Sequence, residues 1–149
     1  MVMSDLHDPI GRHYIVEASG CNEKIISNAG VVQKILVKSA EIAGAKVWSV
    51  SFNQFPPHGV SGVVVISESH ISIHTWPEYG YAALDIYTCG SHVEPEQAIE
   101  FAVQSFEASQ SHITEITRGI DEEDNLFYHS IITWEEDHEK KDPKDGLKK

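Results

Sequence analysis

Apolar side chains recur with a helical period in two parts of the chain. Between residues 25 and 43 they return every three or four positions, which predicts a helix with one apolar face. We expect Ser27 or Asn28 to cap its start and Gly44 to end it. A second helix is expected from Pro95, a residue favoured in the first helical turn. Its apolar positions are Ala98, Phe101, Ala102 and Phe106.

Alternating or continuous apolar runs of four to ten residues predict strands elsewhere. The expected strands are residues 13–18, 46–55, 60–67, 71–74, 81–88 and 112–117, with a last short one around 130–133. The run 60–67 is almost wholly apolar, which is typical of a central strand buried on both faces. Turn-forming residues fill 56–59 and 76–80, and the acidic segment 119–125 is expected to be a loop.

The order β-α-β-β-β-β-α-β favours an α+β fold. We expect a two-layer sandwich, with a largely antiparallel sheet and both helices on one of its faces. Trp48, Phe52 and the tyrosines are candidates for an apolar patch on the other face, which predicts a homodimer that packs sheet against sheet. Residues 1–134 are expected to form one domain, and the charged residues 135–149 a disordered tail.

Composition narrows the class of protein further. A chain of 149 residues is most simply one domain, and its net charge of −12 argues against a nucleic-acid partner. No apolar run reaches the length of about 20 residues that a membrane helix needs, and the N-terminus lacks the pattern of a signal peptide. Cys21 and Cys89 are the only cysteines, which favours a reducing, cytoplasmic compartment in which both are thiols.

Reactive side chains are concentrated between residues 60 and 90. His70 with His74, and Cys89 with His92, have spacings seen in metal sites. The alternation around His74 indicates a strand, however, and residues four apart on a strand are separated by roughly 13 Å. A zinc site is therefore the weaker interpretation of these histidines.

A hydrolase built on Ser69, His74 and Cys89 is also weakly supported, because no G-x-S-x-G turn is present. Each of these side chains taken singly is more often structural than catalytic. The same holds for the aromatic side chains of Phe55 and Trp76, which are more often part of a core than of a ligand site.

The continuous segment from Pro57 to Ser61 and on through SESHISIHTWPEYGYAALDIYTCG resembles the prokaryotic S-adenosylmethionine decarboxylase family, whose members depend on a pyruvoyl group. The similarity covers most of residues 11–118 and is most specific at 59–90. The resemblance implies a proenzyme that cuts itself between Glu68 and Ser69. Ser69 would attack the Glu68 carbonyl carbon, and elimination followed by hydrolysis would leave a covalent pyruvoyl cofactor at position 69.

The resemblance also implies roles for further residues. The pyruvoyl ketone would form a Schiff base with the amine of S-adenosylmethionine and accept electrons as CO2 leaves. His74 would be the base of the self-processing step, Ser61 would hydrogen-bond its oxyanion, and Cys89 would protonate the product carbon. The substrate would be bound by Phe55, Ile71, Trp76 and Glu78. In the family such sites form where two sheets meet in a dimer, and the product donates aminopropyl groups for spermidine synthesis.

Two alternatives remain at this point. Pyruvoyl-dependent arginine decarboxylases share the fold and nearly the same processing motif, although Phe55, Trp76 and Glu78 favour a nucleoside ligand. A second alternative, from another class of protein, is a non-catalytic dimer module that binds metal.

Overall fold

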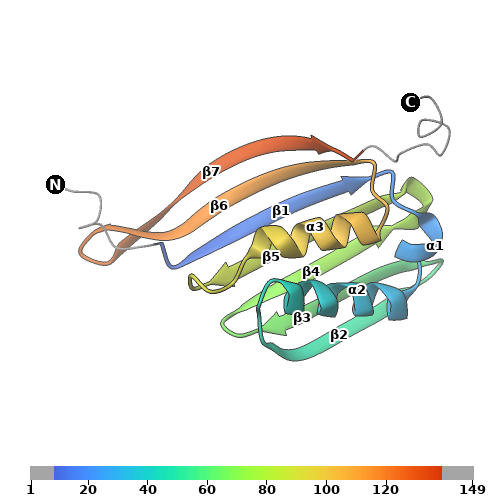
Figure 1. The fold of residues 1–149 in the computed structure, drawn as a ribbon, viewed down its shortest axis with the longest axis horizontal. Helices are drawn as coiled ribbons and strands as arrows, with labels where there is room; N and C mark the ends of the chain where they lie inside the picture. Colours follow the sequence, from blue (N-terminus) through green and yellow to red (C-terminus); the bar gives the residue numbers. More distant parts are fainter. Residues whose placement is uncertain (1–8, 139–149) are drawn as a thin grey trace, which may run out of the picture.

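The computed structural model describes residues 9–138 of the chain (Figure 1). Its strands are antiparallel throughout and lie in one sheet of order β2-β3-β4-β5-β1-β6-β7. The elements in chain order are β1 (Gly11–Ser19), α1 (Glu23–Ile26), α2 (Ala29–Ile42), β2 (Val47–Phe55), β3 (Gly59–Ile66), β4 (Ser69–Trp76), the 3-10 turn η2 (Pro77–Tyr79), β5 (Tyr81–Cys89), α3 (Pro95–Ser105), β6 (Gln110–Glu123) and β7 (Leu126–Asp137). The predicted α+β class is confirmed.

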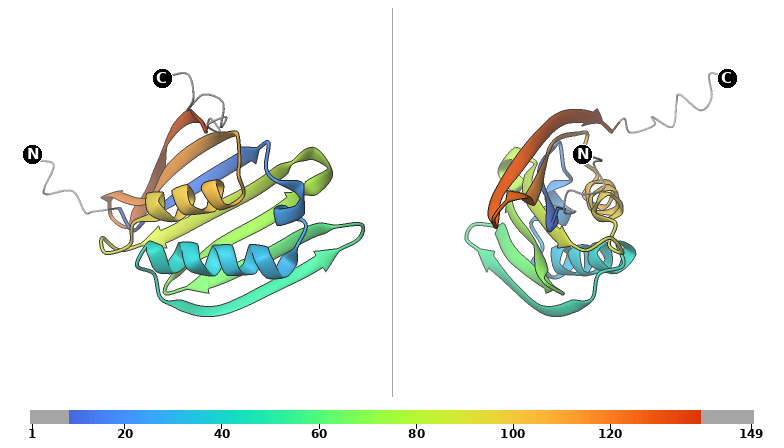
Figure 2. Two further views of the ribbon diagram at one scale, coloured as in Figure 1. Left: turned by 45° about the vertical axis from the view of Figure 1, so that its right-hand side comes forward. Right: turned by 90° about the vertical axis from the view of Figure 1, so that its left-hand side faces the viewer.

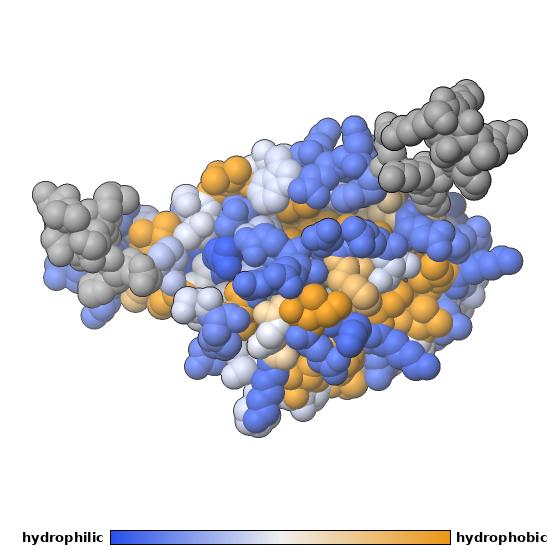
Figure 3. Space-filling model, in the orientation of Figure 1, coloured by the Kyte–Doolittle hydropathy of each residue, from blue (hydrophilic) through white to orange (hydrophobic). Residues whose placement is uncertain are grey.

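Helices α2 and α3 lie side by side on one face of the sheet, and within residues 9–138 the opposite face carries no helix (Figure 2). The core fills the space between the two layers. Its largest fully buried side chains include Tyr14, Phe106, Ile26, Leu36, Ile71, Ile73 and Ile86. Viewed from the helix side, hydrophilic side chains alternate with smaller hydrophobic areas (Figure 3). None of the described helices is long and apolar enough to cross a membrane.

The predicted helix over residues 25–43 is interrupted by a cap. Asn28 has extended backbone angles, and its side chain accepts a hydrogen bond from the Val31 amide, so that α2 starts at Ala29. The residues before it form the separate turn α1, capped in the same way by Asn22. Gly44 follows α2 with φ +85°, a conformation that favours glycine and ends the helix as expected.

The face of the sheet without helices is here called the open face. Register and burial place His13, Ile15, Val65, His74 and Cys89 on it, since their strand neighbours are buried under the helices. The expectation that the strand at 60–67 is buried on both faces is therefore wrong for the single chain, because Val65 is 39% exposed.

The apolar patch on this face differs from the one expected. Phe52 packs against Gly62 and toward the core, so it belongs to the helix side. Trp48 lies at a register shift between β2 and β3 and is 66% exposed. Tyr81 and Tyr87, by contrast, do lie on the open face, as their alternation with buried Ala82 and Ile86 requires.

Strands β6 and β7 form a long hairpin where a loop and a short strand were expected. The loop expected at 119–125 is wrong: β6 continues to Glu123, and Asp124 and Asn125 make the turn with φ of +55° and +59°. These two residue types tolerate left-handed backbone and are common in hairpin turns. β7 runs on to Asp137, which includes the first residues of the expected tail, and residues 139–149 lie outside the described part.

Candidate active site

The hairpin between β3 and β4 places Ser69 directly after a two-residue turn. Ile66 pairs with Ser69 across this hairpin, and Ser67 and Glu68 connect the strands. Glu68 has φ +65°, which is unfavourable for a side chain with a Cβ atom and costs about 1 kcal/mol. The peptide bond after Glu68 therefore follows a strained residue at the tip of a hairpin, where a cut leaves both strands paired.

Cys89 reaches this hairpin tip from the end of β5. The Ser69 hydroxyl donates a hydrogen bond to Cys89 Sγ over 3.3 Å, and the same sulfur lies 3.6 Å from the carbonyl oxygen of Glu68. The Cys89 side chain is half-buried, and no disulfide joins it to Cys21. A hydroxyl, a thiol and a peptide carbonyl thus meet at one point, here called the cleavage corner.

A second group of predicted residues lines a cleft of about 280 Å³ at the other end of β4. Its lining includes Phe55, Ser61, His74, Trp76 and Glu78. Ser61 Oγ and His74 Nδ1 are hydrogen-bonded at 2.8 Å across the β3–β4 pair. We call this site the aromatic cleft.

The walls of the aromatic cleft contain a stacked pair of aromatic rings and a carboxylate. The Trp76 ring stacks on Tyr81 with centroids 5.1 Å apart and an angle of 14° between the planes. Burial, together with the hydrogen bond to Glu17, raises the pKa of Tyr81 to about 12, so its hydroxyl stays neutral. The Glu78 carboxylate lies 3.4 Å from His58 Nε2 and is about half exposed, which leaves it accessible to a polar ligand. The cleft therefore offers a flat aromatic ring, a carboxylate and an imidazole.

Within one chain the cleavage corner and the aromatic cleft are separate. Along β4, His74 is five residue steps from Ser69, which corresponds to roughly 16 Å. The structure therefore does not bring the His74 imidazole to Ser69 of the same chain. Ile71, expected in the substrate pocket, is 1% exposed and points into the core under the helices. It lines neither site, because its position in β4 alternates with the open-face residues.

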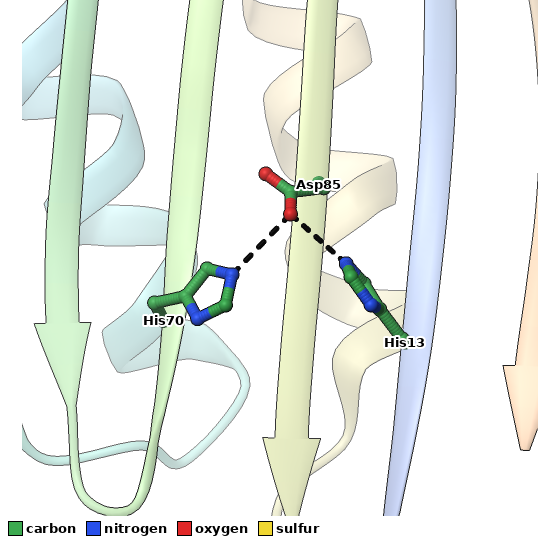
Figure 4. Close-up of side chains that lie close together, drawn as sticks. All are labelled: His13, His70 and Asp85. Atoms are coloured by element: carbon green, nitrogen blue, oxygen red, sulfur yellow. Dashed lines mark hydrogen bonds and ion pairs between the residues drawn. The ribbon is translucent and has the colours of Figure 1, made fainter. Parts of the chain in front are cut away.

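A polar cluster on the open face was missed by the sequence analysis (Figure 4). Asp85 Oδ2 contacts His13 Nε2 at 2.9 Å and His70 Nε2 at 3.3 Å, and the Ser72 hydroxyl also donates to this carboxylate. Burial alone would raise the pKa of Asp85, but the hydrogen bonds from both histidines hold it below its usual value. Polar residues at alternate positions of β4 and β5 could have indicated this cluster. The contribution of His13, however, depends on pairing between segments that are distant in the sequence.

Comparisons of the sequence agree on one family. The profile of the S-adenosylmethionine decarboxylase family matches residues 12–119. The S-adenosylmethionine decarboxylase proenzyme of Thermococcus gammatolerans is 51% identical over 134 residues, which cover 90% of this chain and 93% of that protein. The proenzyme of Caldicellulosiruptor saccharolyticus is 51% identical over 114 residues, 76% of this chain and 92% of that protein.

Solved structures were also found to be similar to this chain. The crystal structure of the adenosylmethionine decarboxylase from Aquifex aeolicus matches with a TM-score of 0.73 and 31% identity, over 80% of this chain and all of that one. The monomer of Trypanosoma brucei AdoMetDC-delta26 shares the fold, with a TM-score of 0.53 at 14% identity over 72% of this chain and 46% of that one. The chain belongs to the S-adenosylmethionine decarboxylase family.

Proposed function

We propose that this protein is made as a proenzyme, cuts itself between Glu68 and Ser69, and then decarboxylates S-adenosylmethionine. The observation that carries the proposal is the cleavage corner, where the Ser69 hydroxyl, the Cys89 sulfur and the Glu68 carbonyl lie within hydrogen-bonding range. Membership of a family whose relatives are named as decarboxylase proenzymes supports the same reaction.

The cut uses the backbone next to Ser69. Its Oγ adds to the Glu68 carbonyl carbon, the C–N bond breaks, and the chain is held by an ester. Removal of the Ser69 α-proton then breaks the Cβ–Oγ bond, so that Glu68 leaves as a carboxylate. Water hydrolyses the remaining enamine in its imine form and releases ammonia, which leaves a ketone at position 69. Relief of the left-handed Glu68 backbone favours the first step.

The expected base for the α-proton does not reach Ser69 within the same chain. His74 is the expected base, yet it stands roughly 16 Å along β4 from Ser69. A second copy packed on the open face, with β4 running in the opposite direction, would bring its aromatic cleft to this cleavage corner. The partly exposed apolar side chains of that face, including Ile15 and Val65, favour such packing. We therefore propose a homodimer with two composite sites.

In the composite site His74 and Ser61 act together on the cleavage step. Their hydrogen bond at 2.8 Å fixes the imidazole ring, which leaves Nε2 to face the partner chain. The neutral imidazole accepts the α-proton as a general base. The Ser61 hydroxyl is proposed to donate to the oxyanion that forms when the partner's own Glu68 carbonyl is attacked.

The aromatic cleft is proposed to bind the nucleoside part of the substrate. Phe55 is 50% exposed and Trp76 is 40% exposed, so both present ring faces to a ligand. An adenine base stacks well on such rings, and a sulfonium cation gains from their negative faces. The Glu78 carboxylate can accept hydrogen bonds from the two ribose hydroxyls.

Decarboxylation needs an electron sink and a proton donor. The pyruvoyl ketone supplies the sink, as carbonyl cofactors do in other decarboxylases. Cys89 lies against position 69, and its thiol is proposed to give a proton to the substrate carbon that has lost CO2. The electron pair of the S–H bond stays on the sulfur. Thiol chemistry of this kind suits a reducing compartment, and we place the enzyme in the cytoplasm.

Mass spectrometry of the purified protein tests the proposal. We expect two fragments that meet at Glu68 and Ser69, the second without a free N-terminal amine. A chain that stays uncut on long incubation would contradict the proposal and favour a non-catalytic module. Release of CO2 from carboxyl-labelled S-adenosylmethionine and from labelled arginine separates the two substrates, and activity on arginine alone would overturn our choice.

A further inference from the structure

Tyr87 lies two residues before Cys89 on β5, so both side chains project from the open face. Burial and the nearby Cys89 side chain raise the pKa of Tyr87. The Tyr87 ring lies over the backbone of Gly11, which pairs with Cys89, so its hydroxyl lies on the side of the sheet from which Cys89 projects. A Cβ atom at Gly11 would stand 2.6 Å from Tyr87 Cε1 and 2.9 Å from its hydroxyl. The space above Gly11 is therefore taken by the Tyr87 side chain together with the Thr88 carbonyl oxygen.

We propose that Tyr87 is a positioning residue for Cys89: its hydroxyl donates to the sulfur and holds it against the cleavage corner. The inference rests on the role proposed above for Cys89. Two other groups contact this sulfur, since the Ser69 hydroxyl donates to it and the Glu68 carbonyl lies 3.6 Å away. Once Ser69 is consumed in the cut, its hydroxyl is lost, and Tyr87 remains as the donor from within the chain.

Arg118 also contacts the Tyr87 ring. Its guanidinium carbon lies 4.6 Å from the ring centroid, a cation-π arrangement. The same guanidinium lies 3.3 Å from Nδ1 of His13. Because arginine can only donate hydrogen bonds, His13 Nδ1 must accept this one, and the ring proton must sit on Nε2. His13 Nε2 therefore donates to Asp85.

The cluster around Asp85 completes this support (Figure 4). His13 and His70 approach its carboxylate from β1 and β4, and their rings lie 5.3 Å and 6.1 Å from the ring of Tyr87. The ligand atoms of His13, His70 and Asp85 lie within 4.8 Å of one another, which would also suit a metal ion. A metal would need the lone pair of His13 Nε2, however, and that nitrogen carries the proton set by Arg118. We therefore assign the cluster to orienting Tyr87.

The hydroxyl of Tyr87 has most effect when the sulfur is negatively charged. Cys89 becomes a thiolate when it gives up its proton, and a neutral O–H donor stabilises that anion. Burial and the neighbouring sulfur raise the pKa of Tyr87, whereas Arg118 opposes the rise, so that the hydroxyl keeps its proton for donation. The expected effect is on turnover and on sulfur reactivity, with little effect on substrate binding.

The Tyr87→Phe variant of the processed protein tests the proposal without any need for turnover. It removes one hydroxyl and keeps the ring. The rate at which iodoacetamide modifies Cys89 at pH 7.5, followed by peptide mass spectrometry, should fall about five- to tenfold, because the reactive thiolate loses a donor. Tyr128→Phe, an exposed tyrosine on β7, is the matched control and should label at the wild-type rate. A Tyr87→Phe protein that labels within twofold of wild type would overturn the proposal.

Steady-state kinetics and a second variant separate positioning from a general structural effect. In Tyr87→Phe we expect kcat to fall several-fold and KM to stay within twofold, whereas a loosened fold would change both. Arg118→Gln should slow the labelling of Cys89 in the wild-type background and have no further effect in Tyr87→Phe, because both act through one hydroxyl. Fully additive effects would overturn the role given to Arg118. If the protein labels as expected but releases no CO2, the proposed function fails while the positioning of Cys89 stands.

Discussion

Ser69 and His74 lie on the same strand but at opposite ends of it, and each has a partner at its own end. Ser69 contacts Cys89 at the cleavage corner, and His74 contacts Ser61 in the aromatic cleft. A strand is too stiff to fold these ends together, so the two groups stay apart within one chain. In the proposed function, self-processing therefore depends on dimer formation.

Replacement of Ser69 by alanine removes the attacking oxygen, so we expect a folded chain that remains in one piece and is inactive. Cleavage should be undetectable by mass spectrometry after days, with a circular dichroism spectrum like that of the wild type. Ser67→Ala, in the same turn, is the control and should be cut normally. Cleavage in the Ser69→Ala chain at the same bond would rule out serine as the nucleophile.

Cys89→Ala should still allow some cleavage but should impair the decarboxylation step. Loss of a general acid typically lowers kcat by about 10²- to 10⁴-fold. The measurement is CO2 release per cleaved chain, with the cleaved fraction determined on the same sample. Cys21→Ala is the comparison, because Cys21 is buried and follows the end of β1 opposite to the one that pairs with Cys89. Normal turnover in Cys89→Ala would show that the proton comes from another group.

Trp76→Ala should weaken substrate binding with a smaller effect on kcat. Stacking of a base on an aromatic side chain contributes about 1–3 kcal/mol, so we expect KM to rise roughly 5- to 150-fold. Trp48→Ala removes an exposed tryptophan outside the aromatic cleft and should leave KM near the wild-type value. Equal effects of the two changes would contradict the assignment of the adenine site.

The sequence predicted the local parts of this site better than their assembly. Alternation around His74 and the Pro77–Gly80 corner were enough to place Trp76 and Glu78 at the end of a strand, beside the turn after Phe55. Ile71 was misplaced because the resemblance carries no information about which face of the strand it occupies. The alternation along β4 decides that: the residues on either side of Ile71 lie on the open face, so Ile71 itself points to the core.

The contacts of Tyr87 and Asp85 could not be predicted from local sequence patterns, because their partners are distant in the chain. His13 and Arg118 lie 74 and 31 residues away from Tyr87 in the chain, and only the order β5-β1-β6 brings them to it.

The β6–β7 hairpin was missed because its acidic sequence masks a two-residue turn. Asp124 and Asn125 were the available signal, since both residue types accept positive φ.

Asp85 should make the stability of the protein depend on pH in the acid range. Its pKa is lowered in the folded state from 3.8, so its ionised form contributes stability above that value, and the contribution is lost as pH falls through the lower folded-state value. We expect Asp85→Asn to lower the free energy of unfolding at pH 7, with a difference from wild type that shrinks below pH 3.8. Urea unfolding at several pH values measures this.

The exposed Glu41 provides a control for that series. It lies on α2 away from the cluster, and its side chain is 57% exposed. Glu41→Gln should therefore change the free energy of unfolding little at any of these pH values. A pH-independent difference between Asp85→Asn and wild type would mean that the histidines do not stabilise the ionised carboxylate.

Co-expression of two inactive variants tests the composite site most directly. Ser69→Ala lacks the nucleophilic hydroxyl, and His74→Ala lacks the base, so each variant alone should remain uncut. In mixed dimers the His74→Ala chain meets an intact His74 of the Ser69→Ala chain. We expect mass spectrometry of the mixture to find the His74→Ala chain cut between Glu68 and Ser69. A mixture in which both chains stay intact, although they form dimers, would contradict the composite site.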